Sequence, residues 1–313
     1  MSRAVLVLLV ACAGTSADPS ITEYAIPTAN SGPYGIALGG DGALWFTEQI
    51  GKIGRVTTAG EVTEFFVPTR SAIPYHIARG SDGSLWFTEK AGNTIGHITL
   101  EGVITELVLP RPDSVPTGIT AGPDSTMWFV EDDGNAVGTI SMTGAITEYP
   151  LAAGNNEAYG ITLGPNDALW FTEQGTNHIA SIGTDMAHAI TELTVPTAAA
   201  DLREIITGPD GNLWFTEFTG GNAIGMITPA GVVTEHALPT AGAQPFDITV
   251  GLDLDLWFTE KAGNAIGRIT LDGAITERAL PTAGSEPARI TLGPDGDLWF
   301  SEYAANQIGR VQR

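Results

Sequence analysis

Two adjacent positions that recur along the chain carry the side chains best suited to binding or catalysis. At the second of these positions three repeats have glycine, namely Gly35, Gly118 and Gly160. The other four repeats have a histidine, an arginine or an acid at this position. Residues of a repeated frame recur and residues of a site break the recurrence, so these departures predict a polar pocket for a small-molecule or peptide-like ligand. The predicted binding residues are Tyr34, Tyr75, Tyr159, Arg203, Glu204, Asp247 and Arg289. The alternative is mutual ion pairing of these arginines with nearby acids at a solvated rim, which contributes about 0–1 kcal/mol per pair.

Proton transfer and metal binding have fewer candidates in the sequence. His76 stands at the second position, and a side chain that titrates near pH 7 suits a general base. Asp247 is a second candidate base. Glu286 precedes the last of these positions, and the carboxylates gathered here are available for a divalent cation, which prefers oxygen ligands. The other histidines have no metal-ligand spacing with one another; they are His97, His178, His188 and His236.

A repeated phrase, Leu-Trp-Phe-Thr-Glu, indicates the elements that position these residues, and it first occurs at residues 44–48. The phrase and its close variants occur seven times, and their tryptophans are 41 to 44 residues apart. One tryptophan in each unit of this length is typical of a β-propeller built from blades of four strands. The sequence therefore predicts an all-β, seven-bladed propeller, in which the tryptophans fill the wedges between blades and the phrase belongs to the frame.

A single unit supports this fold. Residues 245–281 divide into four short segments rich in β-branched and aromatic residues, separated by Gly, Asp or Asn. The predicted strands are Phe246–Val250, Asp255–Glu260, Ala265–Thr270 and Ala274–Leu280. The two recurring positions lie at the start of each innermost strand, which faces the central channel. The seven phrase glutamates are expected to bond locally instead of crowding around that channel, where seven anions would repel one another.

The two ends of the chain indicate how the ring closes. Residues Ile21–Ile26 have the pattern of a fourth strand, and the chain ends at residues 308–312 in the pattern of a third strand. We expect the first segment to complete the last blade, since this removes an open sheet edge. Residues 18–313 then form one propeller domain, and we expect it to be a monomer.

Residues 1–17 precede the propeller and read as a leader for export. An apolar run from Ala4 to Ala11 follows Arg3 and is too short to span a bilayer. The segment Leu9-Val10-Ala11-Cys12 resembles a bacterial lipobox, which implies cleavage before Cys12 and attachment of a lipid to its sulfur. The alternative is an ordinary signal peptide cut after Ala17. Both predict a cell-envelope, periplasmic or secreted protein whose only contact with the membrane is the lipid on Cys12.

The charge of the chain argues against one class of partner. The formal net charge is −22 and the isoelectric point about 4.3. A chain this acidic is repelled by phosphate backbones, so nucleic acid is not an expected partner.

The repeated unit resembles the streptogramin B lyase family, also called virginiamycin B lyases. The resemblance lies in "PYGIALGGDGALWFTE" followed by "GKIGRVTTAGEVTEFFVPT", and it extends over nearly all of residues 21–313. It implies a Mg²⁺-dependent carbon–oxygen lyase that linearises a cyclic depsipeptide antibiotic by elimination. In the family a histidine base removes the proton alpha to the ester carbonyl, and a glutamate helps to hold the metal.

The same resemblance implies which residues would do this chemistry. Phe246 and Ala288 stand where the family has its catalytic histidines, and neither can accept a proton. Glu286 matches the glutamate of the metal site, and Tyr34 matches a tyrosine of the pocket. At a second acidic position of the family this chain has Tyr303, with Glu302 one residue earlier.

Two functions therefore compete, with a third behind them. The first is a lyase that uses a displaced base such as His76 or Asp247. The second is a non-catalytic propeller at the cell surface that binds a ligand or a protein partner. A sugar-lactone hydrolase ranks last because the strand phrases do not resemble those of that group.

Overall fold

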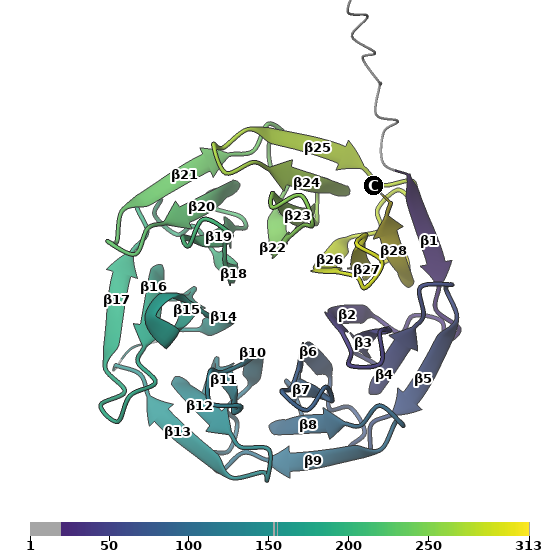
Figure 1. Ribbon diagram of the computed structural model, residues 1–313, viewed down its shortest axis with the longest axis horizontal. Helices are drawn as coiled ribbons and strands as arrows, with labels where there is room; N and C mark the ends of the chain where they lie inside the picture. Colours follow the sequence, from purple (N-terminus) through teal and green to yellow (C-terminus); the bar gives the residue numbers. More distant parts are fainter. Residues whose placement is uncertain (1–19, 153, 155, 313) are drawn as a thin grey trace, which may run out of the picture.

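The computed structural model describes residues 20–152, 154 and 156–312, and these form a ring of seven antiparallel sheets with four strands each (Figure 1). The predicted all-β, seven-bladed propeller is thus confirmed. From the inner to the outer strand, the first four blades are β2 (Pro33–Leu38), β3 (Leu44–Glu48), β4 (Lys52–Val56) and β5 (Val62–Phe66); β6 (Pro74–Arg79), β7 (Leu85–Glu89), β8 (Thr94–Ile98) and β9 (Ile104–Val108); β10 (Pro116–Ala121), β11 (Met127–Glu131), β12 (Ala136–Ile140) and β13 (Ile146–Pro150); and β14 (Ala158–Leu163), β15 (Leu169–Glu173), β16 (His178–Ile182) and β17 (Ile190–Thr194). The last three blades are β18 (Leu202–Thr207), β19 (Leu213–Glu217), β20 (Ala223–Ile227) and β21 (Val233–Ala237); β22 (Pro245–Val250), β23 (Leu256–Glu260), β24 (Ala265–Ile269) and β25 (Ile275–Ala279); and β26 (Pro287–Leu292), β27 (Leu298–Glu302), β28 (Gln307–Val311) and β1 (Ile21–Ala25). A short 3-10 turn, η1 (Pro165–Asp167), precedes β15.

The N-terminal strand closes the ring as the sequence predicts. β1 pairs antiparallel with β28, from Ile21 opposite Val311 to Ala25 opposite Gln307. The ring of Tyr24 stacks on Trp299 of the same blade, with 5.5 Å between the ring centroids. The last blade therefore takes its outer strand from one end of the chain and its other three strands from the opposite end (Figure 1).

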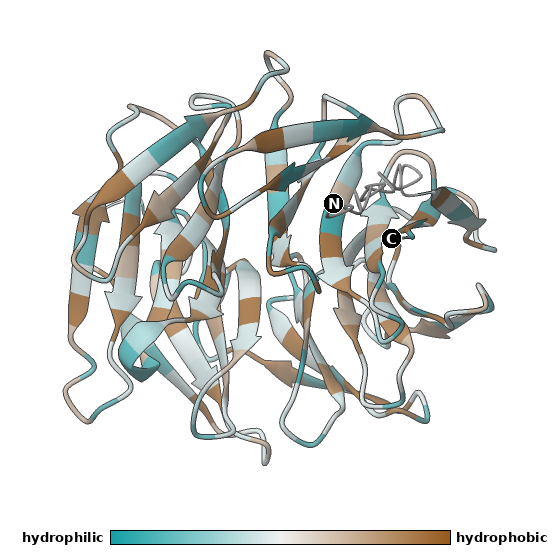
Figure 2. Ribbon diagram, turned by 45° about the horizontal axis from the view of Figure 1, so that its top comes forward, coloured by the Kyte–Doolittle hydropathy of each residue, from teal (hydrophilic) through white to brown (hydrophobic). Residues whose placement is uncertain are grey.

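The phrase strands are the second strand of each blade and form the core. Every residue of β3 is buried, and so is every residue of β23. Trp45 packs against Ile77, Leu85 and Phe87 of the next blade, as expected for a residue that fills the wedge between neighbours. Hydrophobic residues recur along the strands of the ring (Figure 2). The described residues include no helix long and apolar enough to cross a bilayer.

A β-bulge at the start of each inner strand positions the candidate site residues. In the first blade Pro33 is opposite Glu48 and Ile36 is opposite Phe46, so Tyr34 and Gly35 both lie opposite Thr47. The same shift recurs at the inner strands of the other six blades. A bulge bends the strand and re-aims its side chains, so the two recurring positions can both reach the channel.

In five blades the threonine of the phrase holds the bulge and ties it to the next blade, and Ser301 does so in the last blade. The hydroxyl of Thr47 accepts a hydrogen bond from the Gly35 amide at 2.8 Å and donates to the Tyr75 carbonyl at 2.7 Å. Equivalent bonds from other blades include Thr259 to the Ala288 carbonyl at 2.7 Å. Ser301 donates to the Tyr34 carbonyl at 2.6 Å and so links the last blade to the first. These two hydrogen bonds explain why the fourth position of the repeated phrase usually holds threonine.

A pair of glutamates, here called an acid pair, recurs in every blade. The glutamate that ends the second strand is fully buried and lies beside a glutamate of the outer strand of the same blade. The pairs are Glu48–Glu64, Glu89–Glu106, Glu131–Glu148, Glu173–Glu192, Glu217–Glu235, Glu260–Glu277 and Glu302–Glu23. Burial, followed by the charge of the outer glutamate, raises the pKa of Glu217, Glu260 and Glu302 to about 8. Each phrase glutamate thus belongs to its own blade and does not face the channel.

Candidate functional site

Three tyrosines from three blades meet at the centre of the ring. The hydroxyl oxygens of Tyr34 and Tyr75 are 2.6 Å apart, and that of Tyr159 lies 2.7 Å from each of them. The rings of Tyr34 and Tyr75 stack with 4.3 Å between centroids. All three side chains are buried, so this tyrosine triangle forms a closed layer across the channel.

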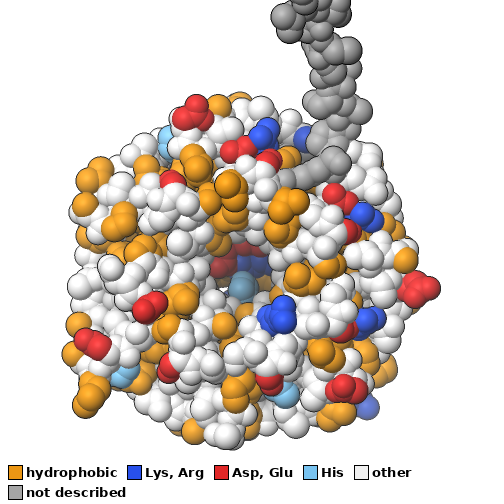
Figure 3. Space-filling view, in the orientation of Figure 1, with side chains coloured by type: hydrophobic (Ala, Val, Ile, Leu, Met, Phe, Trp, Pro, Cys, Tyr) orange, Lys and Arg blue, Asp and Glu red, His pale blue; other side chains and the backbone are white. Residues whose placement is uncertain are grey.

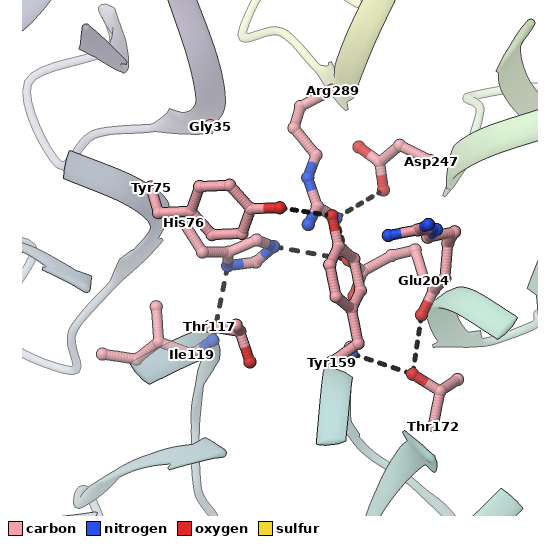
Figure 4. Close-up of polar contacts among 12 residues, drawn as sticks. Gly35, Tyr75, His76, Thr117, Ile119, Tyr159, Thr172, Glu204, Asp247 and Arg289 are labelled. Carbon is pink, nitrogen blue, oxygen red and sulfur yellow. Dashed lines mark hydrogen bonds and ion pairs between the residues drawn. The ribbon is translucent and has the colours of Figure 1, made fainter. Parts of the chain in front are cut away.

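Beneath the triangle, the second recurring position supplies a buried ion network (Figure 4). One guanidinium nitrogen of Arg289 contacts a Glu204 oxygen at close range and lies 3.4 Å from an Asp247 oxygen. Arg289 is only 2% exposed, which makes this a fully desolvated arginine between two acids from the preceding two blades. The backbone amide of Ile290 donates to the other oxygen of Asp247 at 2.7 Å.

His76 joins the network from the opposite wall of the channel. The amide of Ile119 donates to its Nδ1 at 3.4 Å, and its Nε2 lies 3.5 Å from the Glu204 carboxylate (Figure 4). A ring nitrogen that accepts an amide proton carries none itself, so the imidazole proton is on Nε2 and faces Glu204. Burial, followed by the charge of Arg289, lowers the pKa of His76 well below its usual value, which keeps the ring neutral.

The buried acidic groups differ in the direction in which their pKa is shifted. Burial raises the pKa of Asp247 to about 7, although the amides of Ile290 and Ile248 oppose the shift. Burial also raises the pKa of Tyr34 and of Tyr75 well above the usual range of a phenol. Burial alone would raise the pKa of Tyr159, but Arg289, Arg203 and the hydroxyls of the other two tyrosines lower it. Tyr159 is therefore the most acidic phenol of the triangle.

The channel offers two separate hollows. One, of about 240 Å³, is lined by isoleucines and threonines of the inner strands together with His76, Glu204, Asp247 and Arg289. A space-filling view shows acidic, basic and histidine side chains in the hollow at the centre of the ring (Figure 3). The other hollow, of about 270 Å³, is here called the aromatic mouth and is lined by Tyr34, Gln49, Tyr75, Arg203, Phe218, Phe246, Lys261 and Tyr303. The Tyr159 ring lies 5.0 Å from the Arg203 guanidinium of the mouth and 5.5 Å from the Arg289 guanidinium of the other hollow, so the tyrosine triangle lies between the two.

The aromatic mouth combines two cations with aromatic rings. The Arg203 guanidinium lies 4.6 Å from the centre of the Phe218 ring and 5.8 Å from that of Phe246. The Lys261 ammonium lies 5.6 Å from the centre of the Phe246 ring and 5.5 Å from that of Tyr303. Each cation has one acid beside it, since Arg203 pairs with Asp201 at 2.8 Å and Lys261 with Glu286 at 3.6 Å. Such a surface suits a ligand with an apolar ring or side chain and a carbonyl or carboxylate oxygen.

The structure brings all seven predicted binding residues around the channel, but it places them in two layers instead of one rim. Tyr34, Tyr75 and Arg203 line the aromatic mouth, whereas Glu204, Asp247 and Arg289 lie beneath the triangle and line the other hollow. The expectation that both positions form one rim is therefore wrong, because the bulge directs adjacent side chains to different depths. The ion-pair alternative is wrong in its details as well, since the pairs of Arg289 are buried and not solvated.

Apart from Tyr303, the residue after each phrase glutamate was missed as a contributor to the site. This position holds Gln49, Lys90, Asp132, Gln174, Phe218, Lys261 and Tyr303. Four of these residues line the aromatic mouth, namely Gln49, Phe218, Lys261 and Tyr303. The variation of this position next to an almost invariant phrase is a signal that the sequence already carried.

The residues around Glu286 fit a magnesium ion poorly. Glu286 has a left-handed backbone (φ 51°), and its half-exposed carboxylate lies 3.6 Å from the Lys261 ammonium. An ammonium at this distance takes the place that a metal ion would need. At the second acidic position expected from the family the chain has Tyr303, whose ring also faces Lys261. Among the described residues, the one cluster of three side chains suited to hold a metal is in the fourth blade and not here. Magnesium at Glu286 stays a prediction.

The fold and this site define a class of protein, the seven-bladed propellers that carry a ligand-sized mouth at one end of a plugged channel. Residues 13–201 and 157–313 match the sequence profile of the Virginiamycin B lyase family. Among solved structures, virginiamycin B lyase from Staphylococcus aureus is 40% identical, with a TM-score of 0.89 over 95% of this chain and 100% of that one. A streptogramin B lyase structure is also 40% identical, with a TM-score of 0.90 over 94% of this chain and 98% of that one. This chain belongs to the virginiamycin B lyase family.

Two further comparisons bear on the family's chemistry. A structure of a catalytically inactive virginiamycin B lyase from Staphylococcus aureus with quinupristin is 40% identical and covers 95% of this chain, with a TM-score of 0.89. Virginiamycin B lyase from Bacillus licheniformis is 49% identical over 43 residues, which are 13% of this chain and 15% of that protein.

Proposed function

We propose that this chain is a ligand-binding member of the virginiamycin B lyase family. It holds a small peptide-like molecule in the aromatic mouth and does not open that molecule by an elimination reaction. The proposal rests on Phe246 and Ala288, which stand where the resemblance to the family implies histidines. The Phe246 ring lines the mouth, and Ala288 is fully buried beside the tyrosines. Neither side chain can take the proton alpha to an ester carbonyl, and the loss of a positioned base costs about 10²–10⁴-fold in rate.

The remaining groups of the mouth favour binding. Nearby phenols and Asp201 raise the pKa of Arg203 against the effect of burial, so its guanidinium stays charged at any working pH. Lys261 forms an ion pair with Glu286. Two cations held over aromatic rings attract the carbonyl and carboxylate oxygens of a peptide-like ligand, while the rings cover its apolar side chains.

A lyase that uses a displaced base is the second candidate. Its support is the 40% identity to proteins named as lyases, together with Glu286 at a family position. The candidate bases His76 and Asp247 line the hollow on the other side of the tyrosine triangle. Both nitrogens of His76 face a partner, so its lone pair is committed to the Ile119 amide. A substrate in the aromatic mouth would not reach either group, and we therefore rank this candidate second.

The proposal includes no metal. A cation at Glu286 would have to displace the Lys261 ammonium from a contact of 3.6 Å. If Lys261 instead swings away when magnesium is added, the wild-type chain will melt at a higher temperature in magnesium and the variant Glu286→Gln will not.

The decisive experiment offers quinupristin, the compound named with the related structure, to the purified chain with and without magnesium. We expect quinupristin to bind, as measured by calorimetry, and to remain cyclic, as measured by mass spectrometry. The variant Arg203→Ala should bind at least about tenfold more weakly, since a cation–π and charge contact in a partly buried site contributes about 1–2 kcal/mol. The exposed Arg70→Ala is the matched control and should bind as the wild type does.

The double variant Phe246→His with Ala288→His tests why elimination is missing. Formation of linear quinupristin by this variant, and not by the wild type, would support the proposal that the chain lost only its bases. Linear product from the unaltered chain would overturn the proposal in favour of a lyase. Absence of binding by the unaltered chain would also overturn it for this ligand class.

We further propose that the protein acts at the cell envelope. The leader prediction for residues 1–17, with lipid on Cys12, lies outside the described residues. Fractionation of cells that express the wild type or Cys12→Ser tests it, and we expect only the wild type to enter the membrane fraction.

A further inference from the structure

The fourth blade departs from the repeat next to its acid pair. The residue that opens the third strand stands beside the inner glutamate of each pair, and it is Lys52, Thr94, Ala136, His178, Ala223, Ala265 and Gln307 in the seven blades. In the first blade Lys52 places its ammonium 3.4 Å from Glu64, so a side-chain cation occupies the spot. In the fourth blade the spot holds an imidazole.

The imidazole of His178 faces both acids of its blade. Its Nδ1 lies 3.6 Å from an oxygen of Glu173 and 3.6 Å from an oxygen of Glu192. This nitrogen is buried and has no hydrogen-bond partner within the described part of the chain. The three potential ligand atoms lie within 4.8 Å of one another. One nitrogen and two carboxylate oxygens are thus gathered within reach of a single ion.

A second departure removes a side-chain donor that serves the outer acid in other blades. In four other blades a threonine of the preceding connection donates both its amide and its hydroxyl to the outer glutamate, as Thr197 does to Glu235 at 2.9 Å for each bond. The sequence has Ala153 where the fourth blade would need this threonine. Glu192 receives no such pair of hydrogen bonds from the residues that the structure describes. The first break in the repeat places the His178 imidazole beside Glu192, and the second removes a hydroxyl donor from the position that serves Glu192.

We infer that the fourth blade binds a divalent transition-metal cation such as Zn²⁺, through His178 Nδ1 and one oxygen each of Glu173 and Glu192. Ligands about 2.0–2.1 Å from a tetrahedral zinc lie roughly 3.4 Å from each other. The two nitrogen–oxygen separations of 3.6 Å need only a small contraction to reach this value, and the two oxygens lie within 4.8 Å of each other. Histidine nitrogen with carboxylate oxygen is a donor set that zinc accepts, and it suits magnesium or calcium less well.

The surroundings of the three ligands support such a site. Asn156 donates to one oxygen of Glu173 at 3.0 Å, and Thr176 donates to the other at 2.8 Å, which fixes the orientation of this carboxylate. The side chains of His178 and Glu192 are 25% and 32% exposed, so a metal ion and a water as fourth ligand can enter. The bound metal would tie the second, third and outer strands of the blade together.

The test uses the untagged full-length protein after removal of metals with a chelator. Zn²⁺ binding is measured by calorimetry and thermal melting, and the coordination geometry by the visible spectrum of bound Co²⁺. We expect one ion per chain, a higher melting temperature with Zn²⁺, and a tetrahedral Co²⁺ spectrum that Zn²⁺ abolishes. Absence of a stoichiometric Zn²⁺ site would overturn the inference in favour of a cluster held by contacts within the blade alone. An octahedral Co²⁺ spectrum would overturn the proposed three-ligand tetrahedral geometry.

Matched variants locate the site. His178→Ala should bind Zn²⁺ at least about 100-fold more weakly, because loss of a direct ligand costs more than the 10–100-fold typical of outer-shell partners. It should still fold, since alanine opens the third strand at Ala136, Ala223 and Ala265. His97→Ala, which removes a histidine elsewhere in a third strand, is the control and should leave binding unchanged. Ala265→His should add a second ion next to the pair Glu260–Glu277; unchanged stoichiometry there, with binding lost in His178→Ala, would still support the fourth-blade site.

Discussion

The hydroxyl of Thr117 donates a hydrogen bond to the carbonyl of Ala158, 2.8 Å away, between the third and fourth blades. The third blade is the one whose phrase reads Met-Trp-Phe-Val-Glu, with Val130 where the other blades have threonine or serine. Elsewhere that hydroxyl carries the link to the next blade, as Thr88 does to the Thr117 carbonyl at 2.8 Å. Thr117 therefore replaces, from the inner strand, a link that the second strand has lost.

The link through Thr117 should matter for stability. Thr117→Val leaves the buried Ala158 carbonyl without this donor, and an unsatisfied buried group costs about 1–3 kcal/mol. Adding Val130→Thr should recover only part of the loss, because a threonine there would bond the Tyr159 carbonyl in the manner of Thr88 and leave the Ala158 carbonyl without a donor. Urea unfolding measures both, with the exposed Thr63→Val as control. Equal stabilities of Thr117→Val and Thr63→Val would contradict the role of this hydrogen bond.

Closure by the N-terminal strand makes a second prediction. Removal of residues 18–27 takes away β1, exposes the edge of β28 and leaves Trp299 without Tyr24. An open edge and a bare tryptophan should abolish the single cooperative melting transition and promote aggregation. A chain that lacks only residues 1–17 keeps β1 and should melt normally. Moving residues 18–27 to follow Arg313 should restore the transition, and failure of this permuted chain to fold would show that the segment contributes more than its place beside β28.

The frame could be predicted from the sequence because its causes are local. One tryptophan in each unit gives the number of blades, and the turn residues give the bounds of the strands. For example, β23 begins one residue later than predicted and ends at Glu260 as predicted. Closure also follows, since a spare fourth strand and a missing one are both visible in the sequence.

The depth of each site residue could not be predicted, because it depends on a register shift. Tyr34 and Gly35 share one partner residue across the bulge, so neighbours in sequence enter different layers. The triangle of Tyr34, Tyr75 and Tyr159 also needs three blades at their actual separations. The metal cluster was missed because its glutamates belong to the frame and the histidines were compared only with one another.

Arg289 should be the most sensitive residue of the buried network. Arg289→Met removes the guanidinium that Glu204 and Asp247 share, and breaking a buried pair by removing one partner costs about 3–5 kcal/mol. Arg289→Met combined with Glu204→Gln should be more stable than Arg289→Met alone, since less uncompensated charge remains buried. Arg55→Met, which breaks a partly exposed pair with Asp41, should cost no more than about 1 kcal/mol. Chemical denaturation compares the three, and an Arg289→Met variant as stable as Arg55→Met would refute the assignment.

The acid pairs should make the propeller less stable as the pH rises. Burial and the charge of Glu277 raise the pKa of Glu260 in the folded chain from 4.5 to about 8, so the folded state keeps a proton that the unfolded state releases. Stability from such a group is fully present below pH 4.5 and is lost as the pH rises to about 8, by at most about 1.4 kcal/mol per pH unit. Glu260→Gln cannot ionise and should flatten the fall in unfolding free energy between pH 5 and pH 9, as measured with urea. The exposed Glu61→Gln changes the net charge equally and should leave the slope as it is in the wild type; if both variants flatten the slope alike, general charge repulsion and not the buried acid pair causes the pH dependence.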